Sequence, residues 1–169
     1  TNVCAGHSIT LAGSYGGATT SVVWTSDNGG TFSDTTSVTA IYTPSISTGT
    51  VNLTLTSNKP SGSCPAATSA VSIFVIQPPV ASPGPNDSIC GGDTIQLGTP
   101  FQFGYSYSWS PSTGLNNTFT SNPRLTLTNT GNAIVTQTYT LIVSATGCSD
   151  TASMVVSVFP TPLANAGPS

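Results

Sequence analysis

The sequence carries very little charge. Its 169 residues include two Lys or Arg side chains and five acidic side chains, and all five acids are Asp. A domain of ordinary composition has about a quarter of its residues charged. Two basic side chains cannot neutralise a row of phosphates, so we predict no nucleic-acid partner.

Other features are missing as well. No apolar run approaches the roughly 20 residues of a membrane span, so we predict no membrane insertion. The first residues, TNVCAG, lack the basic and apolar regions of a signal peptide, and we expect the chain to be a piece of a longer protein. There is one histidine, His7, and no C-x-x-C pair, which argues against zinc.

Short alternating apolar stretches separated by Gly and Pro are what the chain does have. Thr, Val and Ile are frequent, alongside 17 Gly and 13 Pro. Alternation of apolar and polar residues predicts strands with one buried face and one face in water. The predicted buried faces include Val51, Leu53 and Leu55; Val71, Ile73 and Val75; Tyr139, Leu141 and Val143; and Met154, Val156 and Val158. This pattern favours an all-β fold of antiparallel β-sandwiches.

The chain contains an internal repeat. When Cys4 is aligned with Cys90, VCAGHSITLAGS matches ICGGDTIQLGTP, and Cys64 then meets Cys148. We therefore predict two tandem domains, residues 1–78 and 79–169, taken from a longer array whose neighbouring repeats are partners. The proline-rich stretch 76–85, IQPPVASPGP, is predicted to be a semi-rigid linker.

The two tryptophans occupy nearly the same place in each repeat. Trp24 lies 20 residues after Cys4, and Trp109 lies 19 residues after Cys90. Each continues an alternating apolar face, so we predict that each fills the centre of a core. The alternative is an exposed tryptophan that stacks on a sugar.

The four cysteines allow three disulfide pairings. Because each repeat has one early and one late cysteine, we predict Cys4–Cys64 and Cys90–Cys148. A loop of about 60 residues gives roughly 4 kcal/mol in the chain-entropy model. Such bonds imply an oxidising compartment outside the cytoplasm. The alternative is buried free thiols.

Several stretches resemble a known repeat family. WTSDNGGTFSDTTSVTAIYTPS, GTVNLTLTSN and CPAATSAVSIFV, followed by YSWSPSTGLNN, SNPRLTLT and TYTLIVSATGCSDTASMVVSV, are similar to the PKD-like repeats of very large secreted proteins of Bacteroidota. Those proteins include gliding-motility adhesins of the SprB type. The resemblance implies immunoglobulin-like sandwiches, export through the type IX pathway, and display on the cell surface within a long filament.

Catalytic residues are not recognisable. His7 beside Ser8 does not form a triad, and Asp27 and Asp34 flank a Gly-rich turn whose counterpart in the second repeat has no acid. We interpret these acids as turn caps and predict that the chain is not an enzyme. Calcium is the only cofactor to consider, and its candidate ligands are Asp27, Asn28 and Asp34, and separately Asp87 and Asp93 near the domain junction.

Four Asp residues precede Ser or Thr in a pattern similar to the O-glycosylation sequon of exported Bacteroidota proteins. That resemblance makes Thr35, Ser88, Thr94 and Thr151 candidate glycan sites, with ordinary turn chemistry as the alternative.

An aromatic cluster marks the second repeat. Phe101, Phe103, Tyr105 and Tyr107 fall close together, and the two phenylalanines have no counterpart in the first repeat. They are candidates for contact with a ligand, with core packing as the alternative. We interpret the chain as a structural and adhesive segment of a cell-surface filament, monomeric as a fragment, with a polysaccharide or abiotic surface as its partner. The alternative is a carbohydrate-binding or spacer module of a secreted enzyme.

Overall fold

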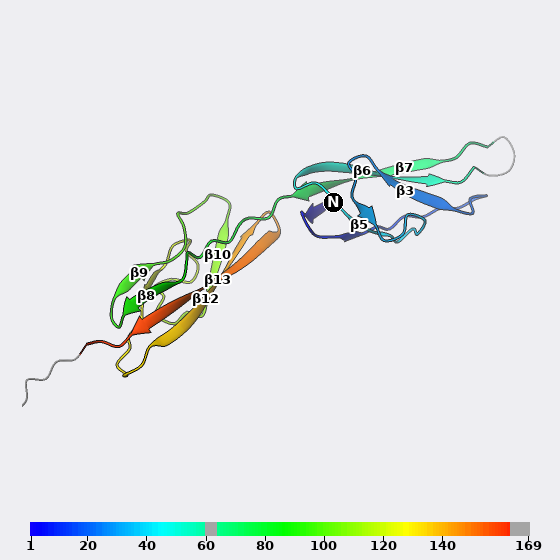
Figure 1. Ribbon diagram of the computed structural model, residues 1–169. Coiled ribbons are helices and arrows are strands. Elements are labelled where there is room, and N and C mark those ends of the chain that lie inside the picture. Colours follow the sequence, from blue (N-terminus) through cyan, green and yellow to red (C-terminus); the bar gives the residue numbers. More distant parts are fainter. Residues whose placement is uncertain (60–63, 163–169) are drawn as a thin grey trace, which may run out of the picture. The chain divides into compact units, whose positions relative to one another are not determined.

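The computed structural model describes residues 1–59 and 64–162. Within these ranges every regular element is a β-strand (Figure 1). The chain divides into two compact units, unit 1 (Thr1–Pro78) and unit 2 (Pro79–Ser169). Each unit is described by itself below.

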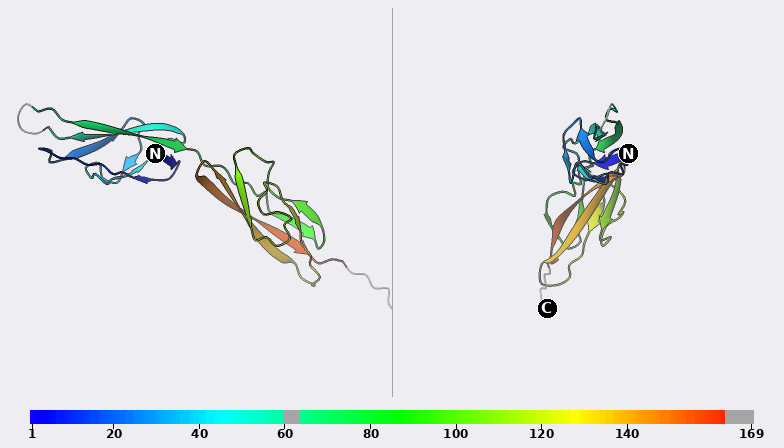
Figure 2. Two further views of the ribbon diagram at one scale, coloured as in Figure 1. Left: turned by 180° about the vertical axis from the view of Figure 1, so that it is seen from behind. Right: turned by 90° about the vertical axis from the view of Figure 1, so that its right-hand side faces the viewer.

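Unit 1 is built from two sheets. The larger has the strand order β1-β7-β6-β3 and the smaller has the order β2-β5-β4. The strands are β1 (Asn2–Cys4), β2 (Ile9–Thr10), β3 (Val22–Ser26), β4 (Thr31–Phe32), β5 (Ile41–Thr43), β6 (Gly49–Ser57) and β7 (Thr68–Ile76). The views in Figure 2 show the two sheets as facing layers.

Unit 2 repeats this plan. Its larger sheet has the order β10-β12-β13-β8, and a two-stranded sheet has the order β11-β9. The strands are β8 (Asp87–Cys90), β9 (Thr94–Gln96), β10 (Ser106–Ser110), β11 (Arg124–Thr126), β12 (Val135–Ala145) and β13 (Cys148–Phe159).

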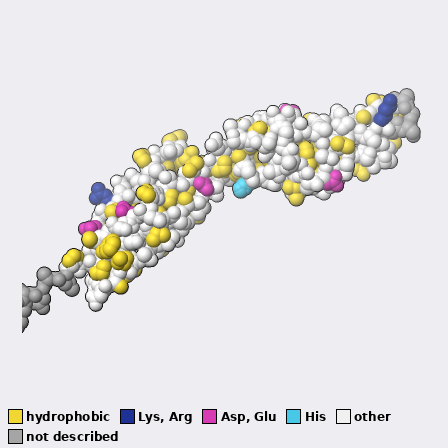
Figure 3. Space-filling model, viewed as in Figure 1, with side chains coloured by type: hydrophobic (Ala, Val, Ile, Leu, Met, Phe, Trp, Pro, Cys, Tyr) yellow, Lys and Arg dark blue, Asp and Glu magenta, His cyan; other side chains and the backbone are white. Residues whose placement is uncertain are grey.

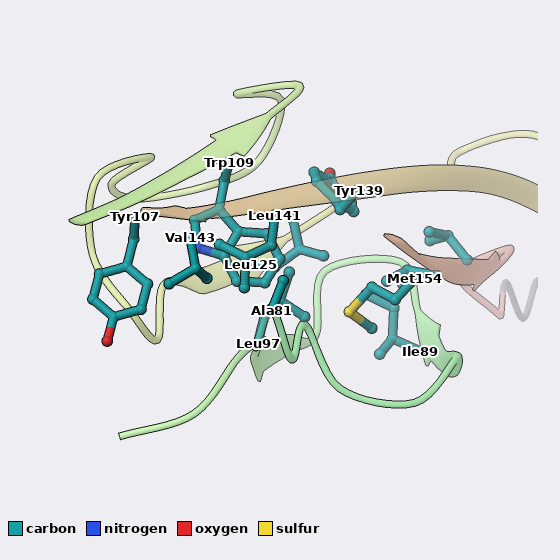
Figure 4. Packing of buried hydrophobic residues seen from close by; sticks show 12 residues of the cluster. Ala81, Ile89, Leu97, Tyr107, Trp109, Leu125, Tyr139, Leu141, Val143 and Met154 are labelled. Atoms are coloured by element: carbon teal, nitrogen blue, oxygen red, sulfur yellow. The ribbon is translucent and has the colours of Figure 1, made fainter. Parts of the chain in front are cut away.

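The alternating apolar residues of the long strands form the two cores. Because successive side chains of a strand point to opposite faces, three consecutive alternate residues in each of β6, β12 and β13 are buried between the sheets. Unit 1 buries Val3, Leu11, Val22, Trp24, Ala40, Tyr42, Val51, Leu53, Leu55, Ile73 and Val75. Unit 2 buries Ala81, Ile89, Leu97, Tyr107, Trp109, Leu125, Tyr139, Leu141, Val143, Met154, Val156 and Val158 (Figure 4).

The predicted all-β sandwich is therefore confirmed, with one addition to its antiparallel pairing. The first strand of each unit pairs in parallel with the last one. In unit 1, Cys4 lies opposite Ile76, and in unit 2, Cys90 lies opposite Phe159. This common register makes Thr1 equivalent to Asp87 and Val71 equivalent to Met154.

The proline-rich stretch is only partly a linker. β7 extends to Ile76, and the stretch soon joins unit 2, because Ala81 is buried in the core of that unit. The backbone N–H of Ala81 donates to Asp150 Oδ2 at 2.8 Å, and the N–H of Gly98 donates to the carbonyl oxygen of Pro83 at 2.9 Å. The second half of the predicted linker thus serves as an additional edge segment of the sandwich.

Candidate binding surface

The loop between β9 and β10 exposes aromatic side chains in unit 2. Phe101 has 67% of its surface exposed and Phe103 has 97%. Tyr105 is half-buried against the core, and Tyr107 is buried within it. The Phe101 and Tyr107 rings contact each other at a tilt, with centroids 6.3 Å apart. The buried ring of Tyr107 therefore supports the exposed ring of Phe101 from the interior of the unit.

A hydrogen bond ties this loop to the same tyrosine. The backbone N–H of Gln102 donates to the Tyr107 hydroxyl at 3.1 Å. Gln102 lies between the two exposed phenylalanines, so the bond holds the backbone that presents them. Aromatic rings presented in this way stack on apolar faces of sugars or pack on another protein surface.

Phe119 is a further exposed aromatic residue that the sequence analysis missed. It has 76% of its surface exposed and lies between β10 and β11. It sits in the polar stretch NNTFTSN, where no alternation predicts burial. An isolated aromatic residue in such surroundings is the signal that would have revealed it.

Neither tryptophan is an exposed ring of the kind that stacks on a sugar. Trp24 is 5% exposed and Trp109 is 3% exposed. Their indole N–H groups donate to backbone carbonyl oxygens, that of Ser37 at 3.0 Å and that of Thr120 at 2.9 Å. Both rings therefore fill a core and satisfy their one polar atom within it.

The predicted disulfide pairing is wrong. Cys64 and Cys90 are free, exposed thiols, and the two disulfide-bonded cysteines are Cys4 and Cys148. Neither Cys4–Cys64 nor Cys90–Cys148 forms.

The reason lies in the last strand of each unit. Cys148 is the first residue of β13 and Cys90 lies opposite Phe159, its last residue. Twelve residues of strand span about 36 Å, whereas the Cα atoms of a disulfide lie within about 7 Å. In unit 1, Cys64 precedes β7 and Cys4 lies opposite Ile76 at its end. The repeat aligned the cysteines correctly, but it could not show that each pair lies at opposite ends of one strand.

The candidate calcium ligands serve as local caps. Asp27 accepts hydrogen bonds from the backbone N–H of Asn52 at 2.9 Å and from its Nδ2 at 2.7 Å. These bonds, the backbone one first, lower the pKa of Asp27 below its usual value. Asp34 accepts from the hydroxyl and the N–H of Thr36, which lowers its pKa in the same way.

The acids of unit 2 also bind nearby backbone. Asp87 accepts from the N–H of Ser88 at 2.7 Å, and Asp93 accepts from the N–H of Cys90 at 3.3 Å. In residues 1–59 and 64–162, no group of three or more His, Cys, Asp or Glu side chains is placed to hold a metal ion. The described acids are used as structural caps of turns and strand ends.

The four candidate glycan sites all lie on the surface. Thr35, Ser88, Thr94 and Thr151 are each exposed. The Thr94 hydroxyl bonds the Thr126 hydroxyl at 2.7 Å, so it is engaged within the sheet.

The surface around these features is almost uncharged. The face shown in Figure 3 carries only scattered acidic and basic side chains among polar and apolar ones. Across the part of the chain that the structure describes, no helix has the length and apolarity needed to span a membrane.

The architecture defines the class: the chain is an all-β protein of two tandem β-sandwich units. Extracellular domains 3–5 of Drosophila OTK are similar at 12% identity and a TM-score of 0.43, covering 94% of this chain and 58% of that one. The insect immune protein hemolin is similar at 13% identity and a TM-score of 0.46, covering 94% of this chain and 44% of that one. The chain thus spans about half the length of these two proteins.

A bacterial structure is also similar in fold. It is a SusE-like, surface-located polysaccharide-binding protein from the heparin utilisation locus of Bacteroides thetaiotaomicron, at 11% identity and a TM-score of 0.37. The match covers 64% of this chain and 24% of that one. No family model and no curated protein matches the sequence.

Proposed function

We propose that the chain is a structural and adhesive pair of PKD-like repeats from a filament on a bacterial cell surface. The parent is a gliding-motility adhesin of the SprB type, exported through the type IX pathway. The protein works outside the cell, it is not an enzyme, and its partners are neighbouring repeats and an external surface.

The observation that carries this proposal is the duplication of one sandwich. Each unit has its own core, its own tryptophan and the same pairing of first and last strands. A chain that repeats a self-contained unit gains length and copy number rather than a reactive centre. Weak contacts made by many such copies add up through avidity.

The acids support a mechanical role. The carboxylates of Asp27 and Asp34, the pair considered for catalysis, each hold the backbone of a turn or a strand. Hydrogen bonds that keep a carboxylate ionised suit a cap rather than a general acid. The low charge also limits unspecific ion pairing with other surfaces.

One observation favours a second candidate, a carbohydrate-binding module. The exposed Phe101 and Phe103 belong to unit 2 alone and are carried on a loop that Tyr107 supports. A spacer needs no such feature, while a sugar-binding site uses aromatic faces of this kind.

Retention of the whole chain on a panel of immobilised polysaccharides, at fixed salt, separates the two candidates. The test variant is the double substitution Phe101→Ala and Phe103→Ala, and the matched control is Phe119→Ala, an exposed phenylalanine of the same unit in another loop. A structural and adhesive repeat, which acts through the avidity of many copies, gives no retention of this single chain by any polysaccharide. Retention that the double variant loses and the control keeps would replace this function by specific sugar binding.

A further inference from the structure

Unit 1 has an open groove along one side of its sandwich. The groove has a volume of about 410 Å³ and is lined mainly by residues of β2, of the stretch after β2 and of the first half of β7. Leu11, Ala12, Trp24, Ser69 and Val71 are among the residues that line it. Val71 has 40% of its surface exposed, which is high for an apolar residue at a position that alternation predicts to be buried.

The same place in unit 2 is occupied by the chain itself. There the segment Val80–Asn86 runs beside β13, with Ala81 buried in the core (Figure 4). Met154, the equivalent of Val71, is only 3% exposed. A Cβ atom on Gly84 would lie 4.0 Å from the sulfur of Met154, so the segment passes directly over this side chain.

Hydrogen bonds fix the segment in unit 2. The N–H of Gly98 donates to the carbonyl oxygen of Pro83, and Gly98 follows Leu97 in the chain as the groove residue Ala12 follows Leu11. The N–H of Val155 donates to Asn86 Oδ1 at 2.8 Å. The segment thus bonds to both sides of the opening that it fills.

In unit 1, a backbone N–H group of β7 points to the place where the segment is bound in unit 2. The N–H of Phe74 donates to the carbonyl oxygen of Thr1 at 2.8 Å, on the side of β7 that β1 occupies. Because N–H directions alternate along a strand, the N–H of Ser72 points to that side as well, beyond Thr1. Ser72 is the equivalent of Val155, whose N–H meets Asn86 in unit 2.

We propose that the groove of unit 1 is a docking site for a short extended segment, rich in proline and small residues, that immediately precedes Thr1 in a longer polypeptide. The segment has the chemistry of Val80–Asn86. An inward small side chain fills the space beside Val71, a carbonyl oxygen accepts from the N–H of Ala12, and an Asn side chain accepts from the N–H of Ser72. The junction between repeats is then the closing edge of the following sandwich.

The register of the two units defines the test. Since Thr1 is equivalent to Asp87, the eight residues PVASPGPN (79–86) placed directly before Thr1 reproduce the segment in its native position. The matched control is the extension PVDSPGPN, which places a carboxylate where Ala81 is buried. Hydrogen exchange of the β7 amides and thermal unfolding are measured on the whole chain with no extension, with the extension, and with the control.

The extension is expected to slow exchange at residues 68–73 at least tenfold and to raise the melting temperature of unit 1 by about 4–8 °C, while the control does neither. Equal values for the extended and unextended chains would overturn the proposal. So would an equal gain from the control, since it would come from added length alone. Protection of β7 that rises with the concentration of the unextended chain, and that the extension does not change, would assign the groove to a second copy instead.

Discussion

The two units share a frame but differ in how one side of it is closed. In both, the first and last strands pair in parallel in the same register, and a tryptophan donates its indole N–H to a loop carbonyl oxygen. In unit 2 the segment that contains Ala81 covers the first half of the last strand. In unit 1 the equivalent half of β7 is exposed, from Thr68 to Ser72.

This difference shows that alternation in a strand predicts a buried face only where another part of the chain covers it. Met154 and Val71 occupy equivalent positions in equivalent strands, yet they are 3% and 40% exposed. The covering segment lies outside the stretch that one cysteine-to-cysteine repeat defines. Comparing the two units therefore shows how this segment changes the burial of the last strand.

Removing a tryptophan is expected to have the largest effect on this comparison. Trp24→Ala and Trp109→Ala each leave a large cavity, and Trp109→Ala also removes the hydrogen bond that the Thr120 carbonyl oxygen accepts, with a cost of about 3–5 kcal/mol for each substitution. Because each unit has its own core, each substitution should destabilise its own unit. Denaturant titration, followed by hydrogen exchange of β6 and of β12 separately, measures this. An equal loss in both units from either substitution would contradict the independence of the cores.

Displacing the segment that covers one side of unit 2 is expected to have the next largest effect. Ala81→Asp places a carboxylate in the core beneath the covering segment, and we expect unit 2 to lose about 1–3 kcal/mol and Met154 to become exposed. Val80→Asp is the matched control, because Val80 is 75% exposed and points outward. It should change the unfolding free energy of unit 2 by less than about 0.5 kcal/mol. If Ala81→Asp leaves the unfolding free energy of unit 2 unchanged, the segment does not stabilise unit 2.

Acid is expected to weaken unit 1 through Asp27 and Asp34. Their pKa values are lowered in the folded state by hydrogen bonds from Asn52 and Thr36. Their contribution is therefore complete above the unfolded pKa of about 4 and is lost as the pH falls below it. Thermal unfolding of the native chain and of Asp27→Ala between pH 6 and pH 2 tests this. The variant should show a smaller decline in acid, and an unchanged decline would exclude Asp27 as its source.

Replacing the free thiols is expected to have the smallest effect. Cys64 and Cys90 are exposed and unbonded, so Cys64→Ser and Cys90→Ser should each change the free energy of unfolding by less than about 0.5 kcal/mol. A thiol reagent should modify both side chains in the native protein before any reductant is added. A loss of several kcal/mol in either variant would restore the pairing expected from the repeat.

Much of the fold could be predicted from the sequence because both cores repeat. The buried faces expected from Val51, Leu53 and Leu55 in β6 are present, with exposures of 0%, 0% and 7%. The same holds for Tyr139, Leu141 and Val143 in β12 and for Met154, Val156 and Val158 in β13. Local alternation was enough here, since a partner sheet or, at Met154, the segment that contains Ala81 covers each of these faces.

The remaining wrong predictions concern contacts between distant parts of the chain. The alternation of apolar and polar residues within one strand does not reveal such contacts. Cysteine pairing depends on which end of a long strand each thiol reaches, and Cys90 and Cys148 reach opposite ends of β13. The exposure of Val71 depends on a segment outside its own repeat. Of the aromatic site, the sequence located Phe101 and Phe103, but the support from Tyr107 required the structure, as did Phe119, an exposed residue outside this site.

The bond between Gly98 and Pro83 also bears on how such repeats can be recombined. A repeat excised or duplicated from its first cysteine onward would leave behind the residues that complete its own sandwich, and would instead carry those of its successor. The unit that folds as a whole begins upstream, before Val80. We therefore expect crossovers that preserve function to fall close to the end of β7, and the buried residues of the segment after that point, such as Ala81, to tolerate as little change as core residues.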